Sequence, residues 1–279
     1  MGLLTTALIG AGALALLRGL DNRIEVTHYE PKFKNLPEEF DGFRIVHISD
    51  LHSDTFPGLK SEIMALEPDM IVITGDMIHD NDKSFMPTVR LIAQLAEISP
   101  LYMVSGNHDL WNTRFDEFAK SCEDAGAVLM DGKFTEISHN GGKIGLFGVK
   151  DPYGKATATI VKSLADSFSL LPEYDGFKML LFHRANQFDR LKDKGFDLIL
   201  SGHMHGGQFR IPGIGGLMPP KSSLQDSKQI IFPAYCSGTF NHNNTTMIVN
   251  RGLGNPMIIP RLYNRPEICL TVLRRADDC

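Results

Sequence analysis

The sequence predicts one α/β domain in which helices cover the faces of a β-sheet. Three observations support this fold class. The chain has 279 residues, of which 43% are hydrophobic, and this is enough for one large core. Short runs of β-branched residues alternate with segments that have helical spacing. The first three of these runs each end in a polar cluster, where α/β sheets bind their ligands.

The first half of the folded chain repeats an order of strand and helix. Strands are expected at 43–49 (FRIVHIS) and 69–74 (DMIVIT), and a helix at 59–66 between them completes a β-α-β unit. The pattern continues as helix, strand, helix and strand at 84–98, 101–104, 114–125 and 143–149. Alternation of this kind predicts a sheet with helices on its faces.

The second half begins with the same pattern and then changes. Buried strands are expected at 177–182 and 197–200, on either side of a short helix at 186–193. From Gly206 onward, loops alternate with expected strands at 230–235, 245–250 and 267–273. This last third therefore predicts a second, more antiparallel sheet.

An uncharged run of sixteen residues, Gly2 to Leu17, opens the chain. It is slightly shorter than the roughly 20 residues that span the hydrocarbon of a bilayer. A secretory signal would carry positive charge before the run, and a buried N-terminal core helix is another alternative. A membrane anchor is favoured, because positive residues follow the run and bias the folded domain of a bacterial protein towards the cytoplasm: Arg18, Arg23, Lys32 and Lys34.

The predicted organisation is a membrane anchor at 1–20, a polar linker at 21–41 and one folded domain at 42–279. The net charge of -5 and the pI near 6.0 exclude a nucleic-acid polymer as partner, since no basic stripe is present to neutralise its phosphates. The cysteines form no close pair, which predicts free thiols in a reducing compartment. They are Cys122, Cys236, Cys269 and Cys279.

Side chains able to bind metal follow the predicted strands at the point where each strand ends. They are Asp50, His52, Asp76, Asn107, His108, His183, His203 and His205. Because the carboxyl ends of parallel strands lie on one edge of a sheet, these residues are expected to converge. Each alone has an ordinary alternative, such as a turn-forming aspartate, but their conjunction at five strand ends favours one metal site. Carboxylates mixed with imidazoles suit Mn, Fe or Zn better than Ca.

The order D-x-H, G-D, G-N-H, a lone H and G-H-x-H resembles the calcineurin-like metallophosphoesterases over approximately residues 43–273. The resemblance implies a four-layer α/β sandwich, in which two mixed β-sheets are flanked by helices and a dinuclear metal site lies at the strand ends. It implies two divalent metal ions, with Mn expected and Fe, Zn or Mg as alternatives. The implied ligands are Asp50, His52 and His205 for one ion, Asn107, His183 and His203 for the other, and Asp76 as the bridge.

This chemistry predicts a hydrolase of phosphodiester or diphosphate bonds. Two cations about 4 Å apart clamp both sides of a phosphoryl group, with a metal-bridging hydroxide as the nucleophile. The resemblance leaves His108 free of metal, as the catalytic residue that stabilises charge or acts as general acid. Phosphoprotein phosphatases of the superfamily carry an orienting aspartate three residues after the bridging one, where this chain has His79. Asp80, another acid or the backbone alone is left to orient His108.

A glycine-rich, apolar loop follows the last histidines at 206–219 (GGQFRIPGIGGLMP). Together with the N-terminal run, it looks like the membrane-anchored bacterial branch that includes UDP-2,3-diacylglucosamine diphosphatases. The loop either packs into the core or forms an apolar lip that admits an acyl-bearing substrate at a membrane surface. The residues in question are Phe209, Ile211, Ile214, Leu217 and Met218, with the cations Arg210 and Lys221.

Hydrolysis of a lipid-linked substrate such as UDP-2,3-diacylglucosamine is therefore the favoured function. Two alternatives remain open. One is a soluble phosphodiesterase acting on nucleotides or cyclic nucleotides. The other is a non-catalytic, metal-bound interaction module, against which the intact set of metal-binding residues speaks.

Overall fold

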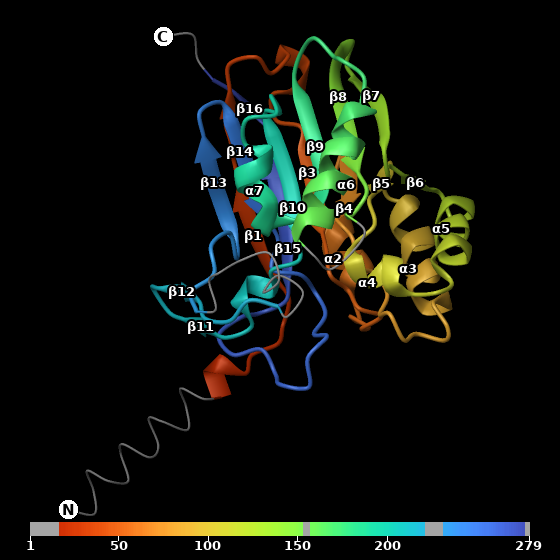
Figure 1. Cartoon of the computed structure of the whole chain (residues 1–279), viewed down its shortest axis with the longest axis vertical. Coiled ribbons are helices and arrows are strands. Elements are labelled where there is room, and N and C mark those ends of the chain that lie inside the picture. Colours follow the sequence, from red (N-terminus) through yellow and green to blue (C-terminus); the bar gives the residue numbers. More distant parts are fainter. Residues whose placement is uncertain (1–16, 153–156, 221–230, 277–279) are drawn as a thin grey trace, which may run out of the picture.

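The computed structural model describes residues 17–152, 157–220 and 231–276. Within these residues, two six-stranded mixed sheets lie face to face, and helices cover the outer face of each sheet (Figure 1). The predicted four-layer α/β sandwich is thus confirmed. Its layers bring together segments that are far apart in the sequence.

The first sheet has the order β1-β15-β3-β4-β5-β6. Its central and outer strands β3 to β6 are parallel, whereas β15 is antiparallel to β3 and parallel to β1. The strands are β1 (Glu25–Tyr29), β15 (Glu267–Val272), β3 (Arg44–Ile48), β4 (Met70–Ile73), β5 (Leu101–Met103) and β6 (Ala127–Leu129).

The second sheet has the order β13-β14-β10-β9-β8-β7. Strands β14, β10, β9 and β8 are parallel, and the antiparallel strands β13 and β7 form its two edges. The strands are β13 (Gly238–His242), β14 (Thr245–Val249), β10 (Leu198–Gly202), β9 (Lys178–Arg184), β8 (Gly142–Val149) and β7 (Lys133–His139).

Helices cover the outer faces because each presents one apolar side to a sheet. Helices α2 (Leu59–Ala65), α3 (Met86–Ala96) and α5 (Phe115–Asp124) pack on the first sheet, and α6 (Thr157–Ser169) and α7 (Phe188–Leu191) pack on the second. The shorter elements are α4 (Asn107–Trp111), η1 (Glu38–Phe40), η2 (Ala185–Gln187), η3 (His205–Gly207) and the strand pairs β11 (Arg210–Ile211) with β12 (Gly215–Gly216) and β2 (Lys32–Phe33) with β16 (Arg274–Arg275).

Both faces of each sheet are buried, which explains why the central strands read as continuous apolar runs. In β3, Ile45 faces the second sheet, whereas Val46 and Ile48 face the helices. Met179 and Leu181 of β9 contribute to the same layer between the sheets as Ile45. This double burial fixes the register of the central strands, because a slip of one residue would exchange the two faces.

The expectation of a separate, more antiparallel sheet in the last third is wrong. Strand β14 instead extends the second sheet parallel to β10, and β15 inserts into the first sheet between β1 and β3. Residues 231–235 form no strand, and Ile230 lies outside the described residues. Both late strands lie inside the two sheets, and a local pattern of hydrophobicity does not specify which strands they pair with.

The polar segment 21–41, interpreted above as a linker, contains regular structure. Strand β1 pairs in parallel with β15, and β2 pairs with β16. Phe33, Leu36 and Phe40 are buried in the layer between the sheets. Prolines and charged residues separate the apolar residues of this segment, so the sequence shows no sustained strand pattern there. The boundaries at residues 20 and 41 stay a prediction.

The predicted location, a membrane anchor with a cytoplasmic catalytic domain, is corrected by the structure. Across residues 17–152, 157–220 and 231–276, every helix is too short or too polar to traverse a bilayer. The apolar run at 2–17 lies outside the described residues except for Leu17, which is exposed. The prediction of a membrane anchor therefore rests on the length and hydropathy of that run, and these alone do not establish it.

Replacement of Phe33 by alanine tests whether segment 21–41 belongs to the folded unit. Phe33 meets Phe177 edge to face at 4.9 Å, and both rings are buried. We expect Phe33→Ala to lower the free energy of unfolding by about 3 kcal/mol, measured by urea denaturation. The exposed neighbour Lys34 supplies the control, because Lys34→Ala should change it by less than about 0.5 kcal/mol. Equal stability of the two variants would mean that the segment acts as a linker.

Candidate metal centre

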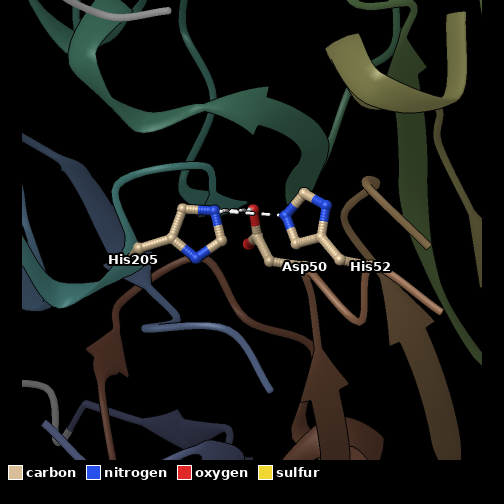
Figure 2. Close-up of side chains that lie close together, drawn as sticks. All are labelled: Asp50, His52 and His205. Carbon is tan, nitrogen blue, oxygen red and sulfur yellow. Dashed lines mark hydrogen bonds and ion pairs between the residues drawn. The ribbon is translucent and has the colours of Figure 1, made fainter. Parts of the chain in front are cut away.

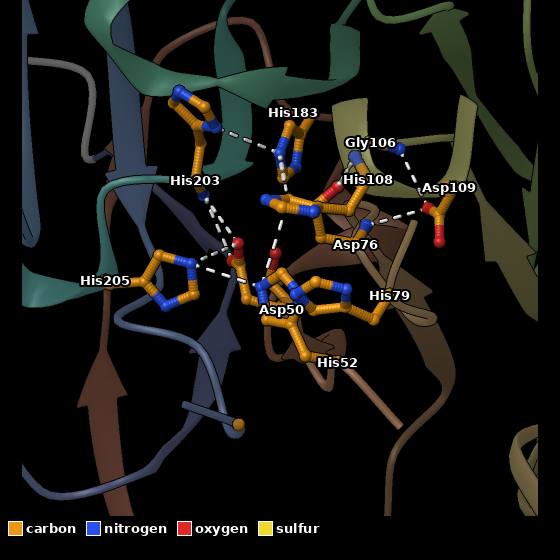
Figure 3. Close-up of polar contacts among 12 residues, drawn as sticks. Asp50, His52, Asp76, His79, Gly106, His108, Asp109, His183, His203 and His205 are labelled. Atoms are coloured by element: carbon orange, nitrogen blue, oxygen red, sulfur yellow. Dashed lines mark hydrogen bonds and ion pairs between the residues drawn. The ribbon is translucent and has the colours of Figure 1, made fainter. Parts of the chain in front are cut away.

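The residues predicted to bind metal converge at one edge of the two sheets, around the carboxyl ends of β3, β4, β9 and β10 and the start of α4 (Figure 3). They are buried with the exception of His108, which is partly exposed. Convergence follows from the topology, since parallel strands place their carboxyl ends on the same side. Their side chains form two clusters.

The first cluster consists of Asp50, His52 and His205 (Figure 2). The Nε2 atoms of the two histidines are 3.2 Å apart. His205 Nε2 also lies 3.4 Å from Asp50 Oδ1. Two imidazole nitrogens and a carboxylate oxygen thus point towards one small volume, as the ligands of a divalent cation do.

The second cluster consists of Asp76, His183 and His203. His183 Nε2 lies 3.2 Å from Asp76 Oδ2 and 3.1 Å from His203 Nδ1. Asn107, at the first position of α4, is also buried, and among the described residues neither its amide oxygen nor its amide nitrogen has a hydrogen-bond partner. A buried amide without a partner is costly in a folded protein, and a bound cation would satisfy its oxygen.

Asp76 belongs to more than one group of possible metal ligands. Its Oδ2 lies 3.2 Å from His183 Nε2 of the second cluster and 3.9 Å from His52 Nε2 of the first. This intermediate position is the one that a carboxylate shared by two ions requires. The residues present therefore fit a dinuclear centre, although the donors by themselves do not identify the metal.

Burial sets the protonation of the first cluster. It raises the pKa of Asp50 to about 6 and lowers the pKa of His52 to about 3. Burial alone would likewise raise the pKa of Asp76, but positive charge on His183 holds it well below its ordinary value. The negative charge of Asp76 in turn raises the pKa of His183 against the effect of burial. Carboxylates in such surroundings are stabilised by a cation, whether a proton or a metal.

Five of the predicted metal-binding residues have a left-handed backbone conformation. Their φ angles lie between 47° and 75°, and they are Asp50, His52, Asp76, His203 and His205. Such angles are unfavourable for residues with a side chain and concentrate at functional sites. Backbone hydrogen bonds hold two of these turns together, since the Asp50 N–H donates to the Gly75 carbonyl and the His52 N–H donates to the Asp76 carbonyl.

Gly75 allows the turns after β4 and β5 to approach each other. Its φ is 96°, and a Cβ atom there would overlap the backbone of Gly106. Asp76 and Asn107, the residues that follow these two glycines, can therefore enter the same site. A side chain at Gly75 would force the two turns apart.

Asp109 connects the same turns and was assigned no role from the sequence. Its carboxylate accepts N–H groups from Asp76 at 2.8 Å, Gly106 at 2.9 Å and Ile78 at 3.0 Å. The position of an acid in the first turn of α4, three residues after Gly106, is a helix-capping signal that the sequence does contain.

Arg261 and Asn264 also support the site, and no motif in the sequence indicates them. The Asn264 amide donates to the His205 carbonyl at 2.7 Å. Arg261 is buried, donates to the Arg251 carbonyl at 3.0 Å and places Nη2 3.4 Å from His205 Nδ1. Both residues lie more than 50 positions after His205, so only the folded chain brings them there.

His108 lies at the solvent side of the clusters. Its backbone N–H donates to Asp76 Oδ1 at 2.7 Å, and its ring meets that of His52 edge to face at 4.9 Å. The Asp80 carboxylate lies 3.6 Å from His108 Nδ1 and also contacts His79. Of the orienting groups that the sequence left open, Asp80 is thus the acid found beside His108.

Comparison with known proteins agrees with this geometry. The family model described as calcineurin-like phosphoesterase matches residues 43–207. The chain is 30% identical to the uncharacterized metallophosphoesterase YkuE of Bacillus subtilis, over 97% of this chain and 93% of the relative. It is 27% identical to the phosphodiesterase YaeI of Escherichia coli, over 83% of this chain and 82% of the relative.

A solved structure shows the same fold. The phosphopantetheinyl hydrolase of Mycobacterium tuberculosis superposes with a TM-score of 0.50 at 14% identity, covering 77% of this chain and 91% of that protein. Family model, sequence relatives and site geometry lead to one conclusion: this chain is a hydrolase that belongs to the calcineurin-like phosphoesterase family.

Proposed function

We propose that this protein hydrolyses a phosphodiester or diphosphate bond in a lipid-linked substrate, such as UDP-2,3-diacylglucosamine, with two divalent metal ions. The observation that carries the two-metal part of the proposal is the position of Asp76 between the two clusters. Manganese is the proposed ion, with iron, zinc and magnesium as the alternatives to test.

In this proposal Asp50, His52 and His205 bind one ion, and Asn107, His183 and His203 bind the other, with Asp76 shared. Two bound ions would polarise the phosphoryl oxygens and lower the pKa of a water molecule towards neutrality. A hydrogen bond to the ring nitrogen that faces away from the site can orient a histidine ligand. His183 Nδ1, for example, donates to the Thr74 carbonyl at 2.7 Å, which directs Nε2 into the site.

His108 is the proposed general acid. It lies outside the two three-residue clusters above, but one of its ring nitrogens is within 4.8 Å of ligand atoms of His52 and Asp76. Its backbone N–H donates to Asp76, and its ring borders that of His52. A partly exposed imidazole beside a phosphoryl group can donate a proton to the leaving oxygen. Asp80, 3.6 Å from His108 Nδ1, would fix the orientation of the ring.

Exposed apolar residues beside the first cluster support a substrate that carries acyl chains. We call Ile211, Ile214, Ile231, Phe232, Ile258 and Ile259 the apolar lip. Hydrogen bonds connect its segments, since Gln208 donates to the Ile259 carbonyl at 2.8 Å and Phe232 donates to the Leu217 carbonyl at 3.2 Å. Gathered apolar side chains of this kind commonly mark a binding surface. Phe209, Leu217 and Met218 are half-buried, and Lys221 lies outside the described residues.

The shared carboxylate provides the first test. We expect Asp76→Asn to lose activity on bis-p-nitrophenyl phosphate with manganese by about tenfold more than Asp50→Asn, because its loss affects both ions. Metal content per chain, measured by mass spectrometry, should fall in parallel. Asp197→Asn is a control, since this buried carboxylate accepts the Lys178 N–H outside the clusters. Equal, mild losses with two ions retained would contradict the dinuclear assignment.

His108→Ala tests the general acid. We expect kcat to fall by about 10²-fold with the metal content unchanged, because general acid catalysis typically contributes this much or more. The loss should shrink for substrates with good leaving groups, which need no protonation. His242→Ala, a change in a histidine that pairs with Asp193 away from the site, should have normal kcat. If His108→Ala instead loses one ion, His108 is a ligand.

The double variant Ile214→Ser with Ile258→Ser tests the apolar lip. The measured quantity is kcat/KM for a lipid-linked diphosphate in micelles divided by kcat/KM for bis-p-nitrophenyl phosphate. We expect this ratio to fall about tenfold, because partial burial of two isoleucines is lost. Val128→Ser, at an exposed position in β6, should leave the ratio unchanged. An unchanged ratio in the double variant, together with faster turnover of nucleotides or cyclic nucleotides, would favour the soluble phosphodiesterase.

A further inference from the structure

A groove of about 530 Å³ lies at the end of β8, between the α4–α5 segment and α6. We call it the β8 groove. Its volume falls within the range of small-molecule binding sites. Among the residues that line it are Leu110, Thr113, Phe115, Lys150, Asp151 and Ser163.

The β8 groove lies on the same edge of the molecule as the metal centre. Strand β8 pairs in parallel with β9, and Val149 is opposite Phe182. Lys150, which follows β8, is therefore beside His183 near the end of β9, and neighbouring strands of a sheet are about 4.8 Å apart. Helix α4 connects the metal centre with the β8 groove, because it begins at Asn107 and its Leu110 lines the groove.

Lys150 places a positive charge in the β8 groove. Within the described part of the chain it makes no ion pair, and its ammonium lies 5.6 Å from the centre of the Phe115 ring. The neighbouring Asp151 carboxylate is buried and already neutralised, because Arg184 donates two hydrogen bonds of 2.8 Å to it. Asp116 supplies an exposed carboxylate at the rim. Lys150 is thus the cation available to a ligand in this groove.

We propose that the β8 groove binds the polar arm of the substrate, which is the part without acyl chains, and that Lys150 contacts a second phosphate in this arm. This inference rests on the proposed function and specifies its substrate class: a phosphoester whose polar arm carries another phosphate about 5 to 10 Å from the reacting one, one or two strand spacings away. The hydroxyl groups of Thr113 and Ser163 provide hydrogen bonds for a sugar.

The order of the second sheet separates the two arms of such a substrate. His203 and His205 follow β10, His183 is near the end of β9, and Lys150 follows β8. Ile211 and Ile214 of the apolar lip belong to the β11–β12 segment, which follows directly after the β10 end and lies to the left of α4 and α6 in the view of Figure 1. The groove is lined by residues of α4, α6 and the β8 end. The reacting phosphate would sit between an apolar and a polar arm.

Two product-like inhibitors test the role of Lys150. Thymidine 3′,5′-bisphosphate and thymidine 5′-phosphate differ only in the second phosphate, and each can compete with bis-p-nitrophenyl phosphate. In the wild-type protein we expect the bisphosphate to have the lower inhibition constant. In Lys150→Ala, the ratio of the bisphosphate constant to the monophosphate constant should rise about tenfold, because a charged hydrogen bond is lost. Lys150→Arg should restore most of the preference.

Lys194→Ala is the matched control. Its ammonium also lies over a phenylalanine ring, 5.5 Å from that of Phe168, but it lines a different pocket, away from the β8 end. This variant should keep the wild-type ratio. An unchanged ratio in Lys150→Ala, or an equal change in Lys194→Ala, would overturn the inference.

A failure of the proposed function is distinguishable from a failure of this inference. If the wild-type protein does not hydrolyse bis-p-nitrophenyl phosphate with any of the four metals, the proposed function fails. Calorimetric titration with the same two thymidine phosphates still measures the effect of Lys150 in that case. A preference for the bisphosphate that disappears in Lys150→Ala supports the β8 groove, and a preference that is absent or unaffected excludes it.

Discussion

The site depends most on the buried carboxylate of Asp76. Its Oδ2 lies between the two clusters, its Oδ1 accepts the backbone N–H of His108, and its own N–H is held by Asp109. Asp76 therefore couples the loop after β4 to α4 and to the end of β9. Burial alone would keep it protonated, but the charge of His183 keeps it ionised. One side chain thus contacts residues of both clusters and holds the backbone of His108 beside them.

Holding Asp76 in this place requires an unfavourable backbone. Five of the residues that form the clusters have positive φ, and each such residue costs on the order of 1 to 3 kcal/mol. The sandwich offsets this cost by burying both faces of its central strands. The strained turns lie directly at the ends of those strands, where Asp109 and Asn264 restrain them. A rigid scaffold under strained turns is an arrangement that orients metal ligands before a metal binds.

The two regions that flank the metal centre differ in polarity. Next to β10, the apolar lip offers exposed isoleucines and a phenylalanine, whereas the end of β8 offers an ammonium and hydroxyl groups. In the proposed function, the clusters and His108 carry out the hydrolysis, and these flanking regions select the substrate. Because parallel strands deliver both regions to the same edge, one substrate with two different arms can contact them together.

The sequence determined the α/β class, most of the strands and helices, and the residues that gather at the site, and its resemblance to a known family implied the four layers. Alternating hydrophobic runs and the residues at their ends are local features, and parallel pairing makes those ends meet. Only the tertiary structure decided that residues 25–33 join the fold and that β14 and β15 complete the two sheets. It also decided that Asp80 and Arg261 lie beside the centre and that Lys150 lines the β8 groove. These contacts join segments distant in the chain, and their side chains belong to no local pattern. Sequence periodicity reports which face of a segment is buried, but not which distant segment covers it.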